Sequence, residues 1–243
     1  MKLVKDLEKS SINQSRVTDK EAEDAFKTIL KWIGENPNRE GLKETPKRVV
    51  KAFKEYYQGY HQDANKELLK TFGEERIKDT PIAEHAIAGL AVGAAMTDSK
   101  PIVEMQFSDF IVNAMDPIVN QAAKLHFMYG GAVNVPIVVR GASGAGTGAA
   151  AQHSQSLESW FCHVPGLKVV TPSNPQNAYD LLLHSFIDPN PVIFMEHKLT
   201  YKIKDHVVLN EMPSSSDLLG KANIESEGNE ITIVSYSNMV NVV

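Results

Sequence analysis

The sequence has very little cysteine, since Cys162 is the only one among 243 residues. An intrachain disulfide is therefore excluded, and so is a zinc site that uses two cysteines. A lone thiol suits a reducing compartment, so we expect a cytoplasmic protein. The opening residues 1–6 are too polar for a secretory signal peptide, which agrees with that expectation.

Long apolar runs, a phosphate-binding loop and a basic patch are missing too. The longest apolar run, residues 86–96, falls short of the roughly 20 residues that a membrane-spanning helix needs, so we expect no membrane segment. The glycine-rich stretch 141–148 lacks the Gly-Lys-Ser/Thr ending of a P-loop and by itself predicts a mobile turn. Charges of both signs alternate in residues 1–72, which indicates solvated helix faces and no nucleic-acid surface.

What is present is the composition of an ordinary globular chain, 42% hydrophobic and 23% charged. The net charge of −5 is unevenly placed, because residues 1–72 sum to +3 and residues 73–243 sum to −8. This change predicts a boundary near Phe72 and Gly73. We expect three parts: a helical segment at 1–72, an α/β domain at 73–215 and the beginning of a further, truncated domain at 216–243.

The first part predicts a helical hairpin. Thr18 and Glu21 have the spacing of a capping box, and a helical apolar face then runs as far as Gly34. Thr45 and Pro46 open a second helix, with proline in the tolerated first turn. A third, short helix is expected at 65–72.

The second part alternates short apolar strands with helices, which predicts a parallel α/β sheet covered on both faces. Ligands of such sheets collect at the carboxyl ends of the strands. The expected strands are 101–106, 135–140, 167–171 and 191–196, and the expected helices are 84–96, 114–128, 155–161 and 175–186.

Residues 79–84 organise this second part. Pro81 disfavours helix at Thr80, and a helix rich in small residues begins at Glu84, so this carboxylate sits where a loop enters a helix. By itself, Glu84 suits a first-turn residue that serves the helix dipole. By themselves, His153 suits a structural histidine and Phe110 a core residue.

Two stretches, residues 32–42 and 44–49, resemble the N-terminal helices of GTP cyclohydrolase I, and the resemblance covers about 19–71. That family needs a zinc site of two cysteines and a histidine, and nothing like its Cys-Glu-His-His motif occurs in this sequence. The resemblance therefore implies a scaffold and no catalytic residue, and we expect no zinc.

Residues 73–243 resemble the β subunit of the thiamine-diphosphate-dependent first component of 2-oxoacid dehydrogenase complexes, above all pyruvate dehydrogenase. The resemblance implies a transketolase-like pyrimidine-binding domain, here incomplete. The matching stretches are 79–84, 104–110, 116–124, 130–131, 136–141, 151–156, 165–170, 188–191 and Glu196.

The resemblance implies roles for four residues. Glu84 matches the glutamate that bonds to the pyrimidine ring of the cofactor, and it favours the imino tautomer that generates the thiamine nucleophile. Phe110 matches the aromatic residue that packs on the pyrimidine, and Gln106 lies beside it. His153 matches the histidine that faces the substrate and assists acyl transfer to the lipoyl group.

The resemblance also implies a potassium loop and two partners. The loop corresponds to Ile137, Ser185, Phe186, Asp188 and Asn190. In this family the cofactor's diphosphate and Mg²⁺ are held by a Gly-Asp-Gly motif of an α subunit, and no such motif occurs in this sequence. We therefore expect half of an active site here, an α subunit as partner in a heterotetramer, and a lipoyl-bearing acyltransferase.

The sequence departs from the family at both ends of the match. The family's opening strand is replaced by the cyclohydrolase-like helices, and residues 231–236 resemble the first strand of a C-terminal domain that does not continue. Three readings stay open: a dehydrogenase β subunit, inactive if the truncation and fusion disable it; a GTP cyclohydrolase; and a non-catalytic chimera.

Overall fold

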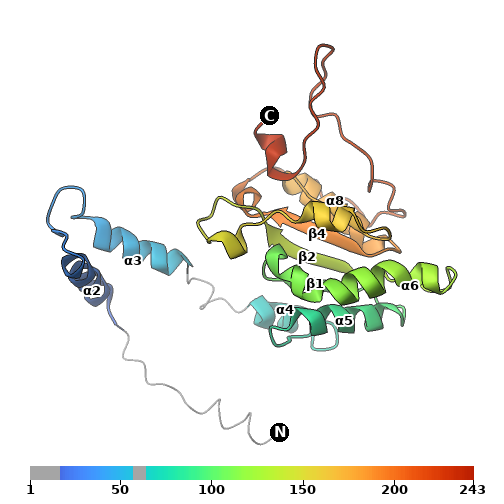
Figure 1. Cartoon of the computed structure of the whole chain (residues 1–243), viewed down its shortest axis with the longest axis horizontal. Coiled ribbons are helices and arrows are strands. Elements are labelled where there is room, and N and C mark those ends of the chain that lie inside the picture. Colours follow the sequence, from blue (N-terminus) through green and yellow to red (C-terminus); the bar gives the residue numbers. More distant parts are fainter. Residues whose placement is uncertain (1–16, 57–63) are drawn as a thin grey trace, which may run out of the picture. The chain divides into compact units, whose positions relative to one another are not determined.

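The computed structural model describes residues 17–56 and 64–243, and it divides into two compact units, Met1–Asp79 and Thr80–Val243. The first unit contains helices and the second a parallel sheet with helices (Figure 1). None of the helices within the described ranges is long and apolar enough to cross a membrane.

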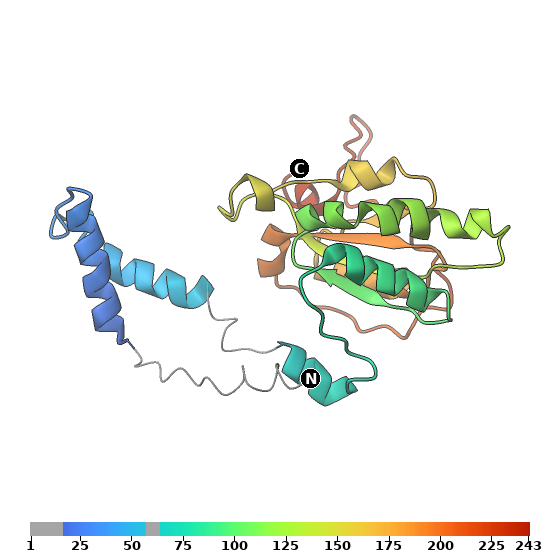
Figure 2. The same cartoon turned by 60° about the horizontal axis from the view of Figure 1, so that its bottom comes forward.

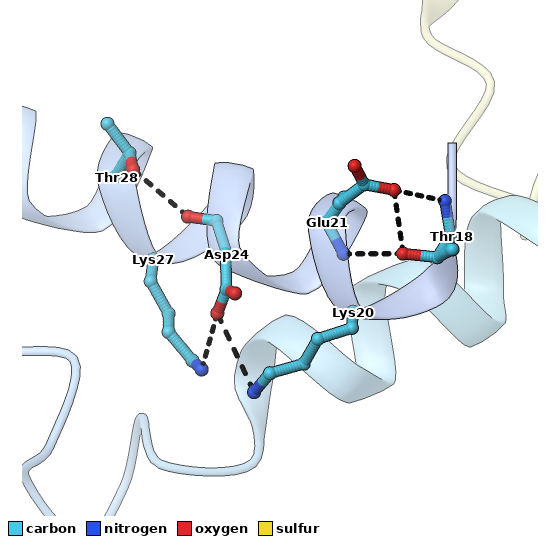
Figure 3. A network of polar contacts seen from close by, with 6 residues as sticks. All are labelled: Thr18, Lys20, Glu21, Asp24, Lys27 and Thr28. Atoms are coloured by element: carbon cyan, nitrogen blue, oxygen red, sulfur yellow. Dashed lines mark hydrogen bonds and ion pairs between the residues drawn. The ribbon is translucent and has the colours of Figure 1, made fainter. Parts of the chain in front are cut away.

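Helix α2 (Asp19–Trp32) begins with the predicted capping box. The Thr18 side chain accepts from the Glu21 N–H, and the Glu21 carboxylate accepts from the Thr18 N–H at 2.7 Å (Figure 3). This contact lowers the pKa of Glu21. Asp24, one turn further on, pairs with Lys20 and Lys27. These pairs are exposed, so they contribute little to stability.

Helix α3 (Thr45–Tyr56) packs on α2 through the rings of Phe26 and Phe53, whose centroids are 5.5 Å apart. A salt bridge of 2.6 Å between Lys54 and Asp19 joins the same two helices. Helix α4 (Ala64–Phe72) follows. The three predicted helices are confirmed. The sequence also predicts an apolar face for the second helix at residues 49, 50, 53, 57 and 60, of which 57 and 60 lie outside the described residues.

The four strands of the second unit are all parallel and lie in the order β1-β2-β4-β3. Parallel strands end at the same edge of a sheet, so the loops after them share one side of the molecule. The strands are β1 (Ile102–Met105), β2 (Val138–Ser143), β3 (Lys168–Val170) and β4 (Val192–His197).

Successive residues of the central strands enter different cores, as the two-residue period of a strand requires. Val139 and Ile193 belong to the larger core, which is formed with α5 (Glu84–Ala95), α6 (Ala123–Met128) and α7 (Glu158–Cys162). Val138 and Phe194 belong to the smaller core, beneath α8 (Pro175–Ile187). Figures 1 and 2 show α5 and α6 on one face of the sheet and α8 on the other. The predicted fold class is confirmed.

Strand β2 differs from the predicted range 135–140. Pro136 has no N–H to donate to a ladder, and the Ile137 N–H turns back to the Val135 carbonyl at 2.9 Å. Pairing therefore begins at Val138 and continues through Ser143. The start of the predicted glycine-rich turn is thus part of the sheet.

The helix predicted at 114–128 begins earlier and changes its winding. It starts as a tight helix, η2 (Ser108–Ala114), widens into a π-helical stretch, η3 (Asp116–Ala122), and ends as α6. Pro117 lies in the first turn of η3, where its missing N–H is tolerated. Apolar periodicity alone does not distinguish these three windings.

The small residues of helix α5 predict a buried helix that packs closely on a neighbour, but only one face of it is buried. Ala88, Ala91, Val92 and Ala95 are buried at spacings of three and four. Leu90 on another face is 69% exposed, and a methyl group added at Gly89 or Gly93 would meet no atom within 4 Å.

Residues 231–236 were expected to form a strand, but they contain no regular structure. No strand within the described residues pairs with them, and an isolated strand is not stable in water. Val234 is accordingly 92% exposed. A short helix, η6 (Ser237–Asn241), ends this part of the chain. The assignment of 216–243 to a further domain stays a prediction.

Candidate active site

Glu84 is the first residue of α5, where the free N–H groups of the helix lie. The residue is half-buried, and its Oε2 accepts from Asn113 Nδ2 at 3.5 Å. This long contact is the only hydrogen bond that the carboxyl makes within the described ranges. A helix N-terminus favours a carboxylate. Most of the hydrogen-bonding capacity of the Glu84 carboxyl stays available to a ligand.

The partner of Glu84 and the predicted ring-packing residue lie on the same tight helix. Phe110 and Asn113 are three residues apart in η2. Side chains three residues apart lie on one face of a 3₁₀ helix. η2 therefore connects the Glu84 carboxyl with the half-buried ring of Phe110.

His153 closes a cluster of three rings. It ends the one-turn helix η4 (Ala151–His153), and its ring meets those of Phe107 and Phe110 edge to face, with centroids 4.7 and 5.2 Å away. The structure thus places His153 against Phe110 directly and relates Glu84 to both through η2. Gln106 is not brought into this cluster: it lies exposed in the bend after β1 and makes no side-chain hydrogen bond among the residues described.

Asp109 fixes the segment that follows His153. Its side chain is 2% exposed, and its Oδ1 accepts from both the backbone N–H and the side-chain amide of Gln155 at 3.0 Å. The Gln155 carbonyl in turn accepts from Gly144 N–H at 2.9 Å. Sequence reasoning missed Asp109, although a carboxylate inside an apolar helical segment is a signal, because buried charges need partners.

Lys198 was also missed. It begins the short helix η5 (Lys198–Lys202) directly after β4, its ammonium donates to the His153 carbonyl, and it lies 5.1 Å from the centre of the Phe107 ring. Phe107, which stands within the matching stretch 104–110, had no role assigned to it. No spacing in the sequence indicates these contacts, because Lys198 is 45 residues from His153 and 91 residues from Phe107 along the chain.

The glycine-rich turn is shaped by close packing. Gly144 has φ of +82°, and a Cβ there would lie 2.1 Å from the ring of His197. Only glycine fits such a position. Burial lowers the pKa of His197; Lys198 acts in the same direction and Glu158 opposes it. Burial therefore favours the neutral form of the imidazole that packs on the turn.

The predicted potassium residues gather near the amino ends of the strands, whereas the ring cluster follows their carboxyl ends: Ile137 precedes β2, and Asp188 and Asn190 precede β4. Asp188 is fully buried, its Oδ1 accepts from the backbone and side chain of Asn190 at 2.9 Å, and Lys168 donates to its Oδ2 at 2.5 Å. The Ile137 carbonyl accepts from Val192 N–H, and the Ser185 hydroxyl donates to the Leu181 carbonyl.

The charge next to Asp188 is thus a lysine ammonium. Burial alone would raise the pKa of Asp188, but the hydrogen bonds from Lys168 and Asn190 lower it. Phe186 faces a different cation, since Lys100 Nζ lies 5.7 Å from the centre of its ring. The structure brings Asp188 and Asn190 together, and potassium at this loop stays a prediction.

A second charged network crosses three strands. Arg140 on β2 bonds to Glu104 on β1 at 2.8 Å and to Glu196 on β4 at 2.7 Å, and Tyr201 also donates to Glu196. Burial raises the pKa of Glu104, and burial followed by the charge of Glu196 raises that of Tyr201. A small cavity of about 190 Å³ adjoins Glu196 and Tyr201 at the start of α8.

Metal-binding clusters are not seen in the described parts of the chain: no three His, Cys, Asp or Glu side chains gather there around one point. Cys162 is exposed at the end of α7.

Comparison with known proteins shows which family the chain belongs to. A family model described as "Transketolase, pyrimidine binding domain" matches residues 51–204, so the match begins within α3. The chain is 45% identical over 185 residues to "Pyruvate dehydrogenase E1 component subunit beta-1, mitochondrial" of Oryza sativa subsp. japonica, which covers 76% of this chain and 49% of that protein.

Two proteins of Bacillus subtilis are equally similar. The match with "2-oxoisovalerate dehydrogenase subunit beta" is 45% identical and covers 70% of this chain and 51% of that protein. The match with "Acetoin:2,6-dichlorophenolindophenol oxidoreductase subunit beta" is 46% identical and covers 72% of this chain and 51% of that protein. The chain spans about half the length of these curated relatives.

Proposed function

Because the chain belongs to the family of transketolase pyrimidine-binding domains, we propose that it is the pyrimidine-binding part of the β subunit of a thiamine-diphosphate-dependent 2-oxoacid dehydrogenase. The reaction would be oxidative decarboxylation with transfer of the acyl group to a lipoyl group. We propose pyruvate as the substrate on the name of the rice relative. The two Bacillus relatives, named for other substrates, are as similar, so identity alone does not favour pyruvate.

The residues of the site fit the pyrimidine end of thiamine diphosphate. The Glu84 carboxyl has one long hydrogen bond and spare capacity, which suits a partner with a ring nitrogen. The half-buried Phe110 offers an apolar surface on the same helix that carries the partner of Glu84. An acid group beside a flat apolar surface is a fitting site for a basic, planar heterocycle.

Each residue would then have one task. When bound, thiamine diphosphate supplies the nucleophilic carbon at which the 2-oxoacid loses its carboxyl group. Glu84 would hold a proton on the carboxyl oxygen that faces the pyrimidine nitrogen. Phe110 would orient the pyrimidine by packing. His153, against Phe110, would hold or move a proton at its ring nitrogen during acyl transfer. Gln106 would lie at the rim.

The proposal includes partners that this chain needs. The α subunit would supply the site for the diphosphate and Mg²⁺, and a lipoyl-bearing acyltransferase would take the acyl group. The family-based potassium loop at Asp188 and Asn190 is part of the proposal, with Lys168 as a competing cation for the same carboxylate. We propose a heterotetramer on the same basis, and a cytoplasmic location because Cys162 is the single cysteine of the sequence.

One observation carries the proposal: in a chain of this family, the ring of Phe110 contacts that of His153, and the helix of Phe110 also contacts Glu84 through Asn113. The test mixes the full chain with its α subunit, thiamine diphosphate and Mg²⁺. Reduction of an artificial electron acceptor is measured in parallel with pyruvate and 2-oxoisovalerate, which would be decarboxylated, and with acetoin, which has no carboxyl group and would be cleaved between its carbonyl and carbinol carbons. Fastest turnover of pyruvate supports the proposal. A complex that forms, binds the cofactor and decarboxylates neither oxoacid overturns it.

His153→Ala separates two steps in the same mixture. We expect it to slow acyl transfer to the lipoyl carrier far more than decarboxylation with the artificial acceptor. Equal losses in the two assays would contradict the role in acyl transfer.

A further inference from the structure

The segment that carries His153 has few internal supports. η4 is a single turn of three residues without a side-chain cap, and it follows a glycine-rich turn. The residue before η4, Ala150, has φ of +60°, a region that non-glycine residues adopt only when their surroundings hold them there. The position of His153 therefore depends on groups outside its own segment.

Two external groups hold the segment. On one side, Asp109 of η2 binds the backbone and side chain of Gln155, two residues after His153. On the other side, the Lys198 ammonium donates to the carbonyl of His153 itself. Lys198 directly follows β4, whose residues Val192–Met195 are all completely buried, so it attaches the segment to a fully buried strand of the sheet.

The Lys198 ammonium has an unusual set of partners. It is half-buried and forms no ion pair with any carboxylate in the described parts of the chain. Its partners are the His153 carbonyl and the face of Phe107, whose ring also meets the His153 imidazole at 4.7 Å. A cation near a ring face is stabilised by about 0.5–2 kcal/mol. Backbone and ring of His153 are thus both connected to one cation, directly and through Phe107.

From this geometry we propose that Lys198 is a positioning residue for His153: it fixes the histidine backbone through its carbonyl and the histidine ring through Phe107. The catalytic consequence rests on the proposed function, whereas the positioning itself does not. Loss of the ammonium frees η4 on its β4 side and leaves only the Asp109 attachment.

The test reads the His153 ring in the isolated full-length chain by ¹H–¹³C NMR of the histidine side chains, with the His153 signal assigned by its loss in His153→Gln. Two phenyl rings next to this imidazole shift its signal away from that of an unstructured histidine. We expect Lys198→Met to move the His153 signal toward the unstructured position, to alter the signal of its chain neighbour His197, and to leave the other six histidines unchanged.

Two variants serve as controls. Lys198→Arg keeps a cation and N–H donors, so it should retain the shifted signal. Lys202→Met makes the same change of charge four residues later in η5 at an exposed residue, and should also retain it. If Lys198→Met does not fold, Lys198→Gln replaces it with the same expectation. A His153 signal that stays in place in the folded Lys198 variant overturns the proposal.

A second readout uses the complex with the α subunit. We expect Lys198→Met to reduce acyl transfer to the lipoyl carrier by at least about tenfold, to leave the affinity for thiamine diphosphate within about twofold, and to be rescued by Lys198→Arg. If the wild-type complex is inactive while the NMR signal moves as expected, the proposed function fails and the positioning role stands. If acyl transfer is unaffected in an active complex, the catalytic consequence fails.

Discussion

The Glu84 carboxyl lies at the positive end of α5 and makes one long hydrogen bond, with Asn113. The Glu84 carboxyl is thus held loosely, whereas the supporting residue Asp109 is held tightly by two hydrogen bonds from Gln155. Such a division leaves the reacting groups free to meet a ligand while the supporting residues set their position.

Glu84→Gln keeps the shape of the side chain and removes its acid group. We expect it to lower decarboxylation in the α/β complex by about 10²–10⁴-fold, the range for a general acid–base group. Thermal unfolding of the chain should hardly change, because the carboxyl has little to lose in the absence of a ligand. The measurement is the steady-state rate with an artificial acceptor, and Glu75→Gln, at an exposed residue, is the control. Undiminished turnover by Glu84→Gln would contradict the assignment.

Asp188→Asn tests how much the ion pair between Asp188 and Lys168 contributes to stability, through the pH dependence of the unfolding free energy. The folded pKa of Asp188 is lowered, so its contribution to stability is complete above the ordinary pKa of about 4 and disappears as pH falls through the lower folded value. We expect the variant to lose about 1.5–3 kcal/mol of unfolding free energy at pH 7 and progressively less below pH 4.

Urea titrations at a series of pH values measure this loss. Asp217→Asn, at an exposed carboxylate, is the matched control and should show no such trend. A loss for Asp188→Asn that is the same at pH 7 and at pH 3 would show that the charge of Asp188 is not the cause.

Among the elements, α6 and the turn before β3 approach each other closely. Gly166 has φ of +100°, and a Cβ there would lie 2.1 Å from the Ala123 carbonyl oxygen. Lys124 Nζ donates to the Pro165 carbonyl at the same place. The turn is therefore tied to α6 by backbone contact as well as by a side chain.

Gly166→Ala should lower the unfolding free energy by about 2–5 kcal/mol, from the strained φ and the backbone clash together. Gly89→Ala in α5 is the opposite case. No atom lies within 4 Å of the added methyl, so the higher helix propensity of alanine should stabilise the chain by about 0.5–1 kcal/mol. Chemical denaturation of both variants measures the contrast. Destabilisation by Gly89→Ala would mean that this face of α5 is covered.

The order of helices and strands could be predicted because each has a local cause. Each helix start depends on residues within one turn of the chain: the capping box at Thr18, the proline at position 46, and the Asn174 cap of α8. The winding of 108–128 could not, because each of its three stretches has only six or seven residues, too few for the apolar pattern to separate a period of about 3.0 from one of about 3.6. The start of β2 depended on a backbone turn at Ile137 that hydropathy does not report.

The site was predicted in part, for the same kind of reason. Glu84, Phe110 and His153 stand in recognisable motifs, so a resemblance identifies them. Lys198 and Asn113 act through contacts between distant segments, which one sequence does not reveal. The prediction of a strand at 231–236 was wrong because alternating apolar residues form a stable strand only beside a neighbouring strand.

Taken as a whole, the chain joins two units, and the boundary found between Asp79 and Thr80 lies a few residues after the one that charge predicted. Residues 73–83 contain no helix or strand and are mostly exposed. A second stretch of this kind, residues 203–236, follows η5. Exposed backbone without regular structure is cleaved first by proteases.

Brief digestion with trypsin should therefore cut at Arg76 or Lys78, and at Lys204 or Lys221, before it cuts between residues 84 and 202. Mass spectrometry of the fragments over time measures the order. Early cleavage between 84 and 202, with residues 73–83 still intact, would mean that the helical unit is an integral part of one fold.

The resemblance of residues 19–71 to GTP cyclohydrolase I predicts a scaffold without that chemistry. With Cys162 as its single cysteine, the purified chain should hold no stoichiometric zinc by elemental analysis and release no dihydroneopterin triphosphate from GTP. Metal-dependent turnover of GTP would refute this view.

The strand order β1-β2-β4-β3 also has a consequence for synthesis on the ribosome. β1 and β2 can pair as soon as both have emerged, but the only strand that β3 pairs with in the sheet is β4, which follows it after the whole of α8. At about 5–20 residues per second, β3 waits on the order of seconds without its partner. Translational pausing within α8 would lengthen that wait, and codon choice there should affect the yield of folded protein more than codon choice after β4.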